Sequence, residues 1–152
     1  MYGDVIMDIK SYIEELERQR KEQDSIYHNA AVRYNLSDTA MWILYTVSDE
    51  VNEYSQQELC KMSYFAKQTI NTAINSLINR GFITLESAEG SKKKKKIVLT
   101  TQGKEYAGKT TDNIHEAEKR AYKHFTDDEL KFYLEMTRKI TDVLRKETEN
   151  QN

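Results

Sequence analysis

The polar face of one predicted helix is the strongest candidate for chemistry in this sequence. Between residues 66 and 79, apolar side chains recur at helical spacing, and the opposite face carries Gln68, Asn71, Thr72 and Asn75. An ordinary solvated helix face usually mixes lysine with glutamate, whereas residues 68–79 include no acidic residue. A surface that faces phosphate would exclude carboxylates, and side-chain amides can pair bidentately with adenine. We therefore interpret this face as a DNA-reading surface.

A run of five lysines, Lys92 to Lys96, lies close to this helix in the sequence. It leads out of a segment that separates two short β-rich runs, Phe82–Leu85 and Lys96–Thr100, which together predict a hairpin with a basic, flexible tip. The alternative interpretations are a solvated charge run or a localisation-like basic tract. The position beside a candidate recognition helix favours phosphate binding.

Elements before and after the polar helix complete a recognisable order. Ser55 and Glu58 have the spacing of a capping box, which predicts a short helix ending near Met62. Gly81 stands just past the end of the polar helix, where glycine is favoured. The order helix, turn, helix, strand, basic loop, strand predicts a winged helix-turn-helix, with one helix for a DNA groove and a charged hairpin for phosphate.

The composition limits which other classes of protein this chain can belong to. The chain has 152 residues, enough for one modest core, and no apolar run approaches the ~20 residues of a membrane helix. It has no signal-peptide pattern and a single cysteine, so we expect a cytoplasmic protein without membrane association. The formal net charge of −2 argues against nucleic acid, but the lysine run concentrates positive charge locally.

Catalytic and metal chemistry find little support. No phosphate-cradling glycine loop or nucleophile elbow is present, so we expect neither an enzyme nor a cofactor. His28, His115 and His124 lack tight ligand spacing, and we assign no metal site. Cys60 is interpreted as a buried structural residue rather than a redox sensor. The ten tyrosines can line an effector pocket or a dimer interface, and the sequence does not choose between them.

Thin amphipathic helices flank the centre of the chain. Apolar residues recur at helical spacing between Val5 and Leu16 and, after a second capping box at Thr126 and Glu129, between Leu130 and Leu144. A weaker helical stretch covers residues 26–34. Because such stripes need a partner surface, we expect a two-fold dimer in which the terminal helices of both chains interdigitate.

Taken together, these pieces resemble the MarR family of bacterial transcription regulators. The residues that carry the resemblance are Leu36-Ser37 leading into Trp42-Ile43-Leu44, Ser55-Gln56-Gln57-Glu58-Leu59, Lys67-Gln68-Thr69-Ile70-Asn71, Leu77, Gly81-Phe82-Ile83, Ile97-Val98-Leu99-Thr100 and Gly103. The resemblance is strong over about residues 36–103 and rests on pattern alone in the flanking helices.

The resemblance implies a mainly α fold with a small β-hairpin and three regions. These are an N-terminal dimerisation helix region (1–35), a winged helix-turn-helix DNA-binding domain (36–101) and C-terminal dimerisation helices (102–152). It further implies an obligate homodimer on a pseudo-palindromic operator, most often a repressor, and allows a ligand pocket for a small-molecule effector. The candidate DNA-contacting residues are Ser63, Lys67, Gln68, Thr69, Asn71, Thr72, Asn75, Ser91, Lys92, Lys93, Lys94 and Lys95.

Two positions depart from the family pattern. The wing, Glu89 to Lys93, lacks the arginine that the family inserts into the minor groove, and lysine has no planar fork. Phosphate attraction is therefore expected there, while minor-groove reading is left open. Ala66 replaces the usual hydroxyl cap of the recognition helix, which leaves Ser63 or water as the cap. The alternative function is a winged-helix module for protein interaction that has lost DNA binding.

Overall fold

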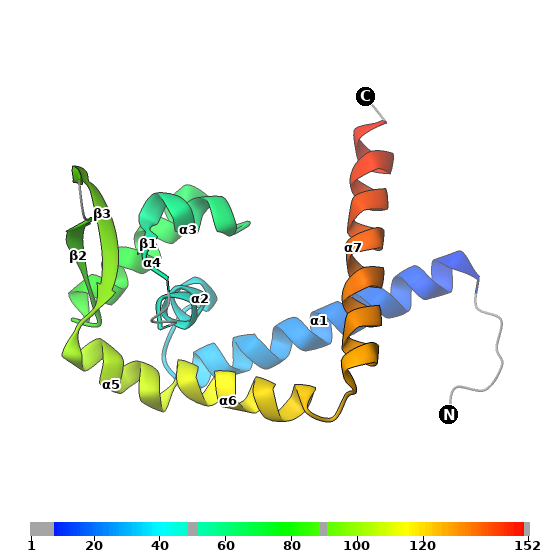
Figure 1. Ribbon diagram of the computed structural model, residues 1–152, viewed down its shortest axis with the longest axis horizontal. Coiled ribbons are helices and arrows are strands. Elements are labelled where there is room, and N and C mark those ends of the chain that lie inside the picture. The colour runs from blue at the N-terminus through cyan, green and yellow to red at the C-terminus, as the bar shows by residue number, and fades with distance from the viewer. Residues whose placement is uncertain (1–7, 49–51, 89–90, 151–152) are drawn as a thin grey trace. The chain divides into compact units, whose positions relative to one another are not determined.

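A computed structural model describes residues 8–48, 52–88 and 91–150, which divide into two compact units, one up to Asp112 and one from Asn113 (Figure 1). Its elements in chain order are α1 (Ile9–Arg33), α2 (Asp38–Val47), β1 (Tyr54–Ser55), α3 (Gln56–Met62), α4 (Lys67–Asn79), β2 (Ile83–Ala88), β3 (Ser91–Leu99), α5 (Thr101–Lys109), α6 (Thr111–Tyr122) and α7 (Asp127–Glu149). The predicted fold class, mainly α with a small β element in a winged helix-turn-helix, is confirmed.

The core of the first unit lies where α2, α3 and α4 meet the sheet. Its fully buried aliphatic side chains come from these helices and from β2, and they are Ile43, Leu44, Leu59, Ile70, Ile74, Leu77 and Ile83. Most of α2 is buried, and Ser37 caps this helix by accepting a hydrogen bond from the Ala40 amide. The capping box of Ser55 and Glu58 is also present at the start of α3.

The sheet is larger than the predicted hairpin. It has three strands in the order β1-β3-β2, all antiparallel, and the two-residue β1 pairs Tyr54 with Ile97 and Ser55 with Lys96. Such a short strand leaves no alternating pattern in the sequence. The hairpin strands are also longer than expected, because the lysine run forms part of β3 instead of a loop. Lysine is a poor strand former, but Glu86 lies opposite Lys96, an opposite-charge pair of the kind that stabilises a ladder.

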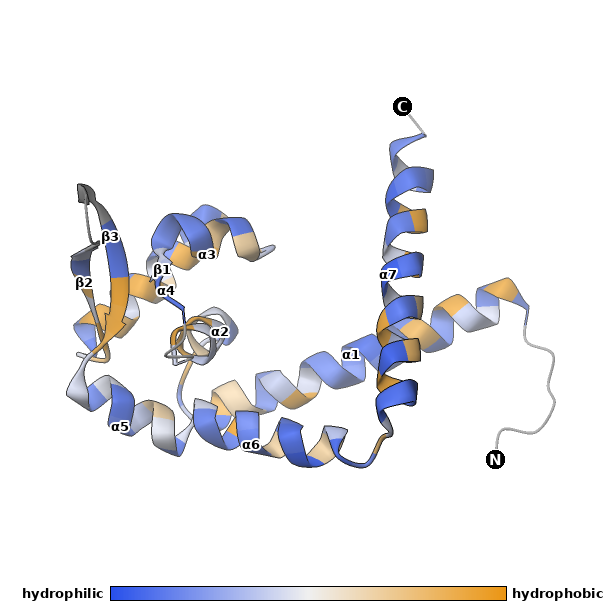
Figure 2. Ribbon diagram, viewed as in Figure 1, coloured by the Kyte–Doolittle hydropathy of each residue, from blue (hydrophilic) through white to orange (hydrophobic). Residues whose placement is uncertain are grey.

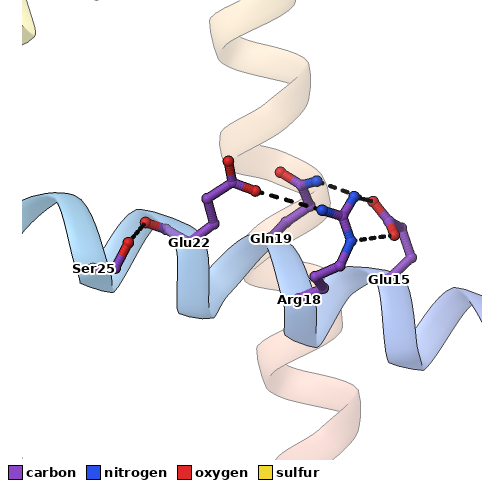
Figure 3. A network of polar contacts seen from close by, with 5 residues as sticks. All are labelled: Glu15, Arg18, Gln19, Glu22 and Ser25. Carbon is purple, nitrogen blue, oxygen red and sulfur yellow. Dashed lines mark hydrogen bonds and ion pairs between the residues drawn. The ribbon is translucent and has the colours of Figure 1, made fainter.

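The first helix is continuous over 25 residues, whereas the sequence suggested two separate stretches. Val5 and Ile6 of the predicted stripe lie outside the described residues. A ladder of polar contacts spans the segment where the apolar stripe fades (Figure 3). Glu15 accepts hydrogen bonds from Arg18 at 2.6 and 2.9 Å and from Gln19 at 3.0 Å, and Arg18 also lies 3.6 Å from Glu22. These one-turn contacts explain how the helix continues without an apolar anchor at this point.

The same contacts determine the pH range over which the Glu15 carboxylate stabilises α1. The hydrogen bond from Arg18, followed by that from Gln19, lowers the pKa of Glu15 to about 2. The carboxylate therefore contributes its helix-stabilising contacts fully above its ordinary pKa of 4.5 and loses them as the pH falls toward 2.

The ends of α1 and α4 use the same backbone device. Each ends in a Schellman motif with a left-handed residue, Asn35 (φ 50°) after α1 and Gly81 (φ 74°) after α4. The position expected for Gly81 is thus confirmed. Arg80 joins the two ends, since its Nη1 donates to the Asn35 carbonyl at 2.8 Å and its guanidinium lies 4.7 Å from the centre of the Phe82 ring.

In the second unit, α7 begins at the predicted capping box, where Thr126 and Glu129 bond reciprocally. Apolar residues recur along it as separate patches in Figure 2. Its large exposed apolar side chains are Phe132, Tyr133, Leu134, Ile140, Val143 and Leu144. No residue of α7 is buried, so the second unit by itself leaves this apolar stripe exposed.

Replacing Arg80 with alanine should lower the free energy of unfolding by about 2–3 kcal/mol, because it removes a charge-assisted hydrogen bond and a cation–π contact. Arg80→Lys should recover only part of this, since an ammonium lacks the planar fork. Denaturant unfolding at matched protomer concentration measures the change, with the exposed Arg20→Ala in α1 as the control. A loss for Arg80→Ala no larger than that of the control would contradict this role.

Candidate nucleic-acid interface

The recognition-helix candidate α4 presents its polar face to solvent. Ile70, Ala73, Ile74 and Leu77 are buried against the core. The candidate contact residues Lys67, Gln68, Thr69, Thr72 and Asn75 are exposed, and Asn71 is half-buried. The amphipathic division expected from the sequence is therefore present. The exposed side chains are amides, hydroxyls and one cation, all able to meet base edges or phosphate.

Two of these side chains already have partners inside the protein. The Thr72 hydroxyl donates to the Gln68 carbonyl at 3.0 Å, one turn earlier in the helix. The Asn71 Oδ1 accepts a hydrogen bond from Nε2 of Gln56, the first residue of α3. The sequence gives no sign of a role for Gln56 in this face. No pattern marks it, because the two amides lie fifteen positions apart and meet only when α3 packs against α4.

The N-terminus of α4 has no side-chain cap. Ala66 occupies the cap position, and no side chain bonds to the first helical amides. Of the two expected caps, Ser63 and water, Ser63 is therefore excluded. Ser63 instead ends α3, and its Oγ is buried with no hydrogen-bond partner among the described residues. The first amides of α4 thus stay available for an anion such as a DNA phosphate.

The turn before α4 carries an exposed aromatic residue that the sequence analysis overlooked. Tyr64 is fully exposed, while the neighbouring Phe65 packs edge-on against Trp42 with ring centres 5.8 Å apart. Phe65 therefore anchors the turn to α2, while Tyr64, three residues before the start of α4, stays exposed. A tyrosine hydroxyl at this place is a further candidate for a phosphate contact.

The wing lysines differ in their surroundings. Lys96 forms an ion pair with Glu53, and the Lys96 side chain is only 21% exposed. Lys95, on the other side of the strand, is exposed and pairs across the ladder with Ser87. The register then slips, so that Ala88 pairs with Ser91 and the three residues Lys92 to Lys94 form a bulge in β3. The side chains of Ser91 to Lys94 lie outside the described part of the structure.

The other candidates form no second site. His28 bonds to Asp38 at 2.9 Å on the surface between α1 and α2. No group of three metal-binding side chains occurs among the described residues. Cys60 is half-buried rather than buried as expected. Within residues 8–48, 52–88 and 91–150, no helix combines the length and apolar character needed to cross a membrane.

Comparison with known proteins shows what this winged helix is similar to. Residues 34–94 match the model of the MarR family. The resemblance expected from the sequence is confirmed. The matched segment contains α2, β1, α3, α4, β2 and the first residues of β3, and therefore all the candidate DNA contacts except Lys95.

Solved structures share the MarR fold over most of the chain. A MarR family regulator from Neisseria meningitidis is 19% identical, with a TM-score of 0.77 over 96% of this chain and 100% of that chain. A putative MarR family transcriptional regulator from Listeria monocytogenes, solved in complex with 26mer DNA, is 20% identical, with a TM-score of 0.67 over 91% and 90%. Staphylococcus aureus MarR in complex with salicylate and kanamycin is 15% identical, with a TM-score of 0.66 over 90% and 92%. Among curated protein sequences, none matches the chain.

The bulge lysines of this MarR-like wing provide a test of phosphate binding. Replacing Lys92, Lys93 and Lys94 together with glutamine should reduce the slope of log affinity against log salt by about 0.9 for each phosphate that the wing no longer neutralises, or up to about five for two wings. Affinity for operator and for scrambled DNA should fall together, because phosphate contacts carry no sequence information. The control is Lys96→Gln, which should change the slope little because Lys96 already pairs with Glu53. An unchanged slope in the triple variant would show that the run is only solvated.

Proposed function

We propose that this chain is a dimeric, sequence-specific DNA-binding transcription regulator of the MarR type, a ligand-responsive repressor on a pseudo-palindromic operator. The observation that carries the proposal is the exposed, acid-free polar face of α4 within a winged helix-turn-helix. This face supplies base-reading groups, the uncapped N-terminus of α4 supplies amides, and the wing supplies lysines. A regulator from Listeria monocytogenes with the same fold was solved in complex with 26mer DNA, which supports a DNA-binding role.

Dimer formation is part of the proposal, because α1 and α7 each carry an apolar stripe that the helix's own unit leaves exposed. Ile9 and Ile26 of α1 are 75% and 62% exposed, and Leu134 and Leu144 of α7 are 51% and 54% exposed. Burial of such stripes against a second copy would supply the hydrophobic driving force for association. Two-fold symmetry would also place two α4 helices on half-sites about one helical turn apart.

Ligand control is proposed from the fold neighbours. Staphylococcus aureus MarR was solved with salicylate and kanamycin, and a further protein of this fold, NadR, with 4-hydroxyphenylacetate. We extend the class of ligand, a small aromatic acid, to this chain without assigning residues. We propose that this ligand regulates DNA binding, and we propose no catalytic activity for the chain.

The alternative function is a protein-interaction module that has kept the winged fold. The formal net charge of −2 and the absence of an arginine in the wing favour it. The acid-free face of α4 opposes it, since a protein-binding surface has no reason to exclude carboxylates. Salt separates the two, because DNA binding weakens steeply as salt rises.

Selection of bound sites from random DNA, followed by sequencing, tests the function directly. We expect a pseudo-palindromic motif whose half-sites are centred about 10–10.5 base pairs apart, or a multiple of this. Binding to the selected motif should exceed binding to scrambled DNA and should fall linearly with log salt. Recovery of no enriched motif, with only weak and sequence-independent retention of DNA, would favour the interaction-module alternative.

The dimer can be tested with charges placed on the α7 stripe. The double variant Leu134→Asp, Leu144→Asp should sediment as a monomer and lose operator affinity by at least about 100-fold, because buried unpaired carboxylates oppose association. Both side chains are half-exposed within one protomer, so the fold of the chain itself should persist. The control Glu135→Lys changes the charge on the opposite, exposed face of α7 and should stay dimeric. A double variant that remains a stable dimer would refute the proposed interface.

A further inference from the structure

The contact between Gln56 and Asn71 joins the two helices of the helix-turn-helix through side-chain amides. Nε2 of Gln56 donates to Oδ1 of Asn71, and both residues are half-buried. The backbone at Gln56 is fixed because the preceding Ser55 is buried, pairs with Lys96 of β3 and caps α3. The backbone at Asn71 is fixed because the preceding Ile70 is fully buried. The amide pair therefore sits between two rigid segments.

This pair limits what Asn71 can offer to a base. An asparagine that reads adenine bidentately must turn its oxygen and its nitrogen to the same base edge, the oxygen toward N6 and the nitrogen toward N7. The oxygen and nitrogen of a planar amide point in different directions. When Oδ1 points to Gln56, Nδ2 is the group left for DNA, and it can only donate.

We propose that Gln56 is a specificity-positioning residue, which holds the Asn71 amide so that Asn71 reads hydrogen-bond acceptors. The inference rests on the proposed function and refines it. Guanine and thymine present only acceptors among their polar major-groove groups, whereas cytosine presents a donor. One position of each half-site should therefore prefer guanine or thymine over cytosine by about tenfold, without Gln56 itself contacting DNA.

A single change of atom reverses the geometry. In Gln56→Glu the carboxylate accepts but does not donate, so the Asn71 amide must turn to donate from Nδ2 to Glu and release Oδ1. The released oxygen accepts from adenine N6 or cytosine N4. The base preference at that position should switch accordingly. A glutamate at the start of a helix is compatible with the helix dipole, so α3 should persist.

The measurement is the affinity of each variant for all single-base variants of the selected operator. Gln57→Glu is the matched control, because it adds the same charge at the next, exposed position of α3. It should weaken all sites alike and leave the preference profile unchanged. Gln56→Ala should flatten the preference at the switched position, and Asn71→Ala should abolish both the preference and the switch by Gln56→Glu.

The outcomes are distinguishable. A switch in Gln56→Glu that is absent in Gln57→Glu and in the Asn71→Ala background supports the inference. A wild-type protein that binds its operator while Gln56→Glu and Gln56→Ala keep its profile overturns the inference and leaves the proposed function intact. A wild-type preference for cytosine at the Asn71 position also overturns it, because cytosine presents a donor and no acceptor there. A wild-type protein without specific DNA binding overturns both.

Discussion

The guanidinium of Arg80 connects the C-termini of α1 and α4, and the placement of α4 depends on this connection. Arg80 is the last residue before the left-handed Gly81, and it donates to the carbonyl of Asn35, the left-handed residue that ends α1. The carbonyl ends of both helices carry partial negative charge, so a cation between them stabilises both. Tyr106 of α5 closes the arrangement, because its hydroxyl donates to the Tyr34 carbonyl and its ring stacks on Phe82 with centres 4.1 Å apart.

This arrangement determines which parts of α4 remain available. The C-terminal end is held by Arg80 and the apolar face by the core, so the N-terminal amides and the polar face are the surfaces left open. The open surfaces lie beside the turn that contains Tyr64, and they are the surfaces that a DNA-binding role requires. Within the first unit, the same contacts fix the direction in which α1 leaves the winged helix (Figure 1). A ligand that moved α1 would act on α4 through Arg80, which offers a physical route for the proposed regulation.

Much of this architecture could be predicted from local sequence signals. The capping boxes at Ser55 and Thr126, the glycine after α4 and the 3.6-residue periodicity each report a local backbone preference, and each was confirmed. Features that depend on pairing with distant residues were not predicted. The strand β1 exists only because β3 pairs with it, and the extension of β3 through the lysines depends on its pairing with β2 and on the register slip at Ala88.

The features of the candidate DNA interface also divide into those that were predictable from the sequence and those that were not. The exposed face of α4 follows from periodicity and was predictable, but the Gln56–Asn71 pair follows from packing of α3 on α4 and was not. Its position in the sequence made Ser63 one of two expected caps of α4, with water as the other, yet the Ser63 hydroxyl is buried. In the wing, two lysines that are adjacent in the sequence have different surroundings. Lys96 forms an ion pair with Glu53, whereas Lys95 is exposed to solvent.

The central claim is that α4 reads DNA through the major groove, and methylation interference on the selected operator tests it most directly. Methylation at guanine N7 blocks the major groove, whereas methylation at adenine N3 blocks the minor groove. The account predicts interference from guanine N7 methylation in two clusters related by the operator symmetry and about one helical turn apart. Interference from adenine N3 methylation alone, or binding unaffected by methylation at guanine N7 throughout the operator, would contradict it.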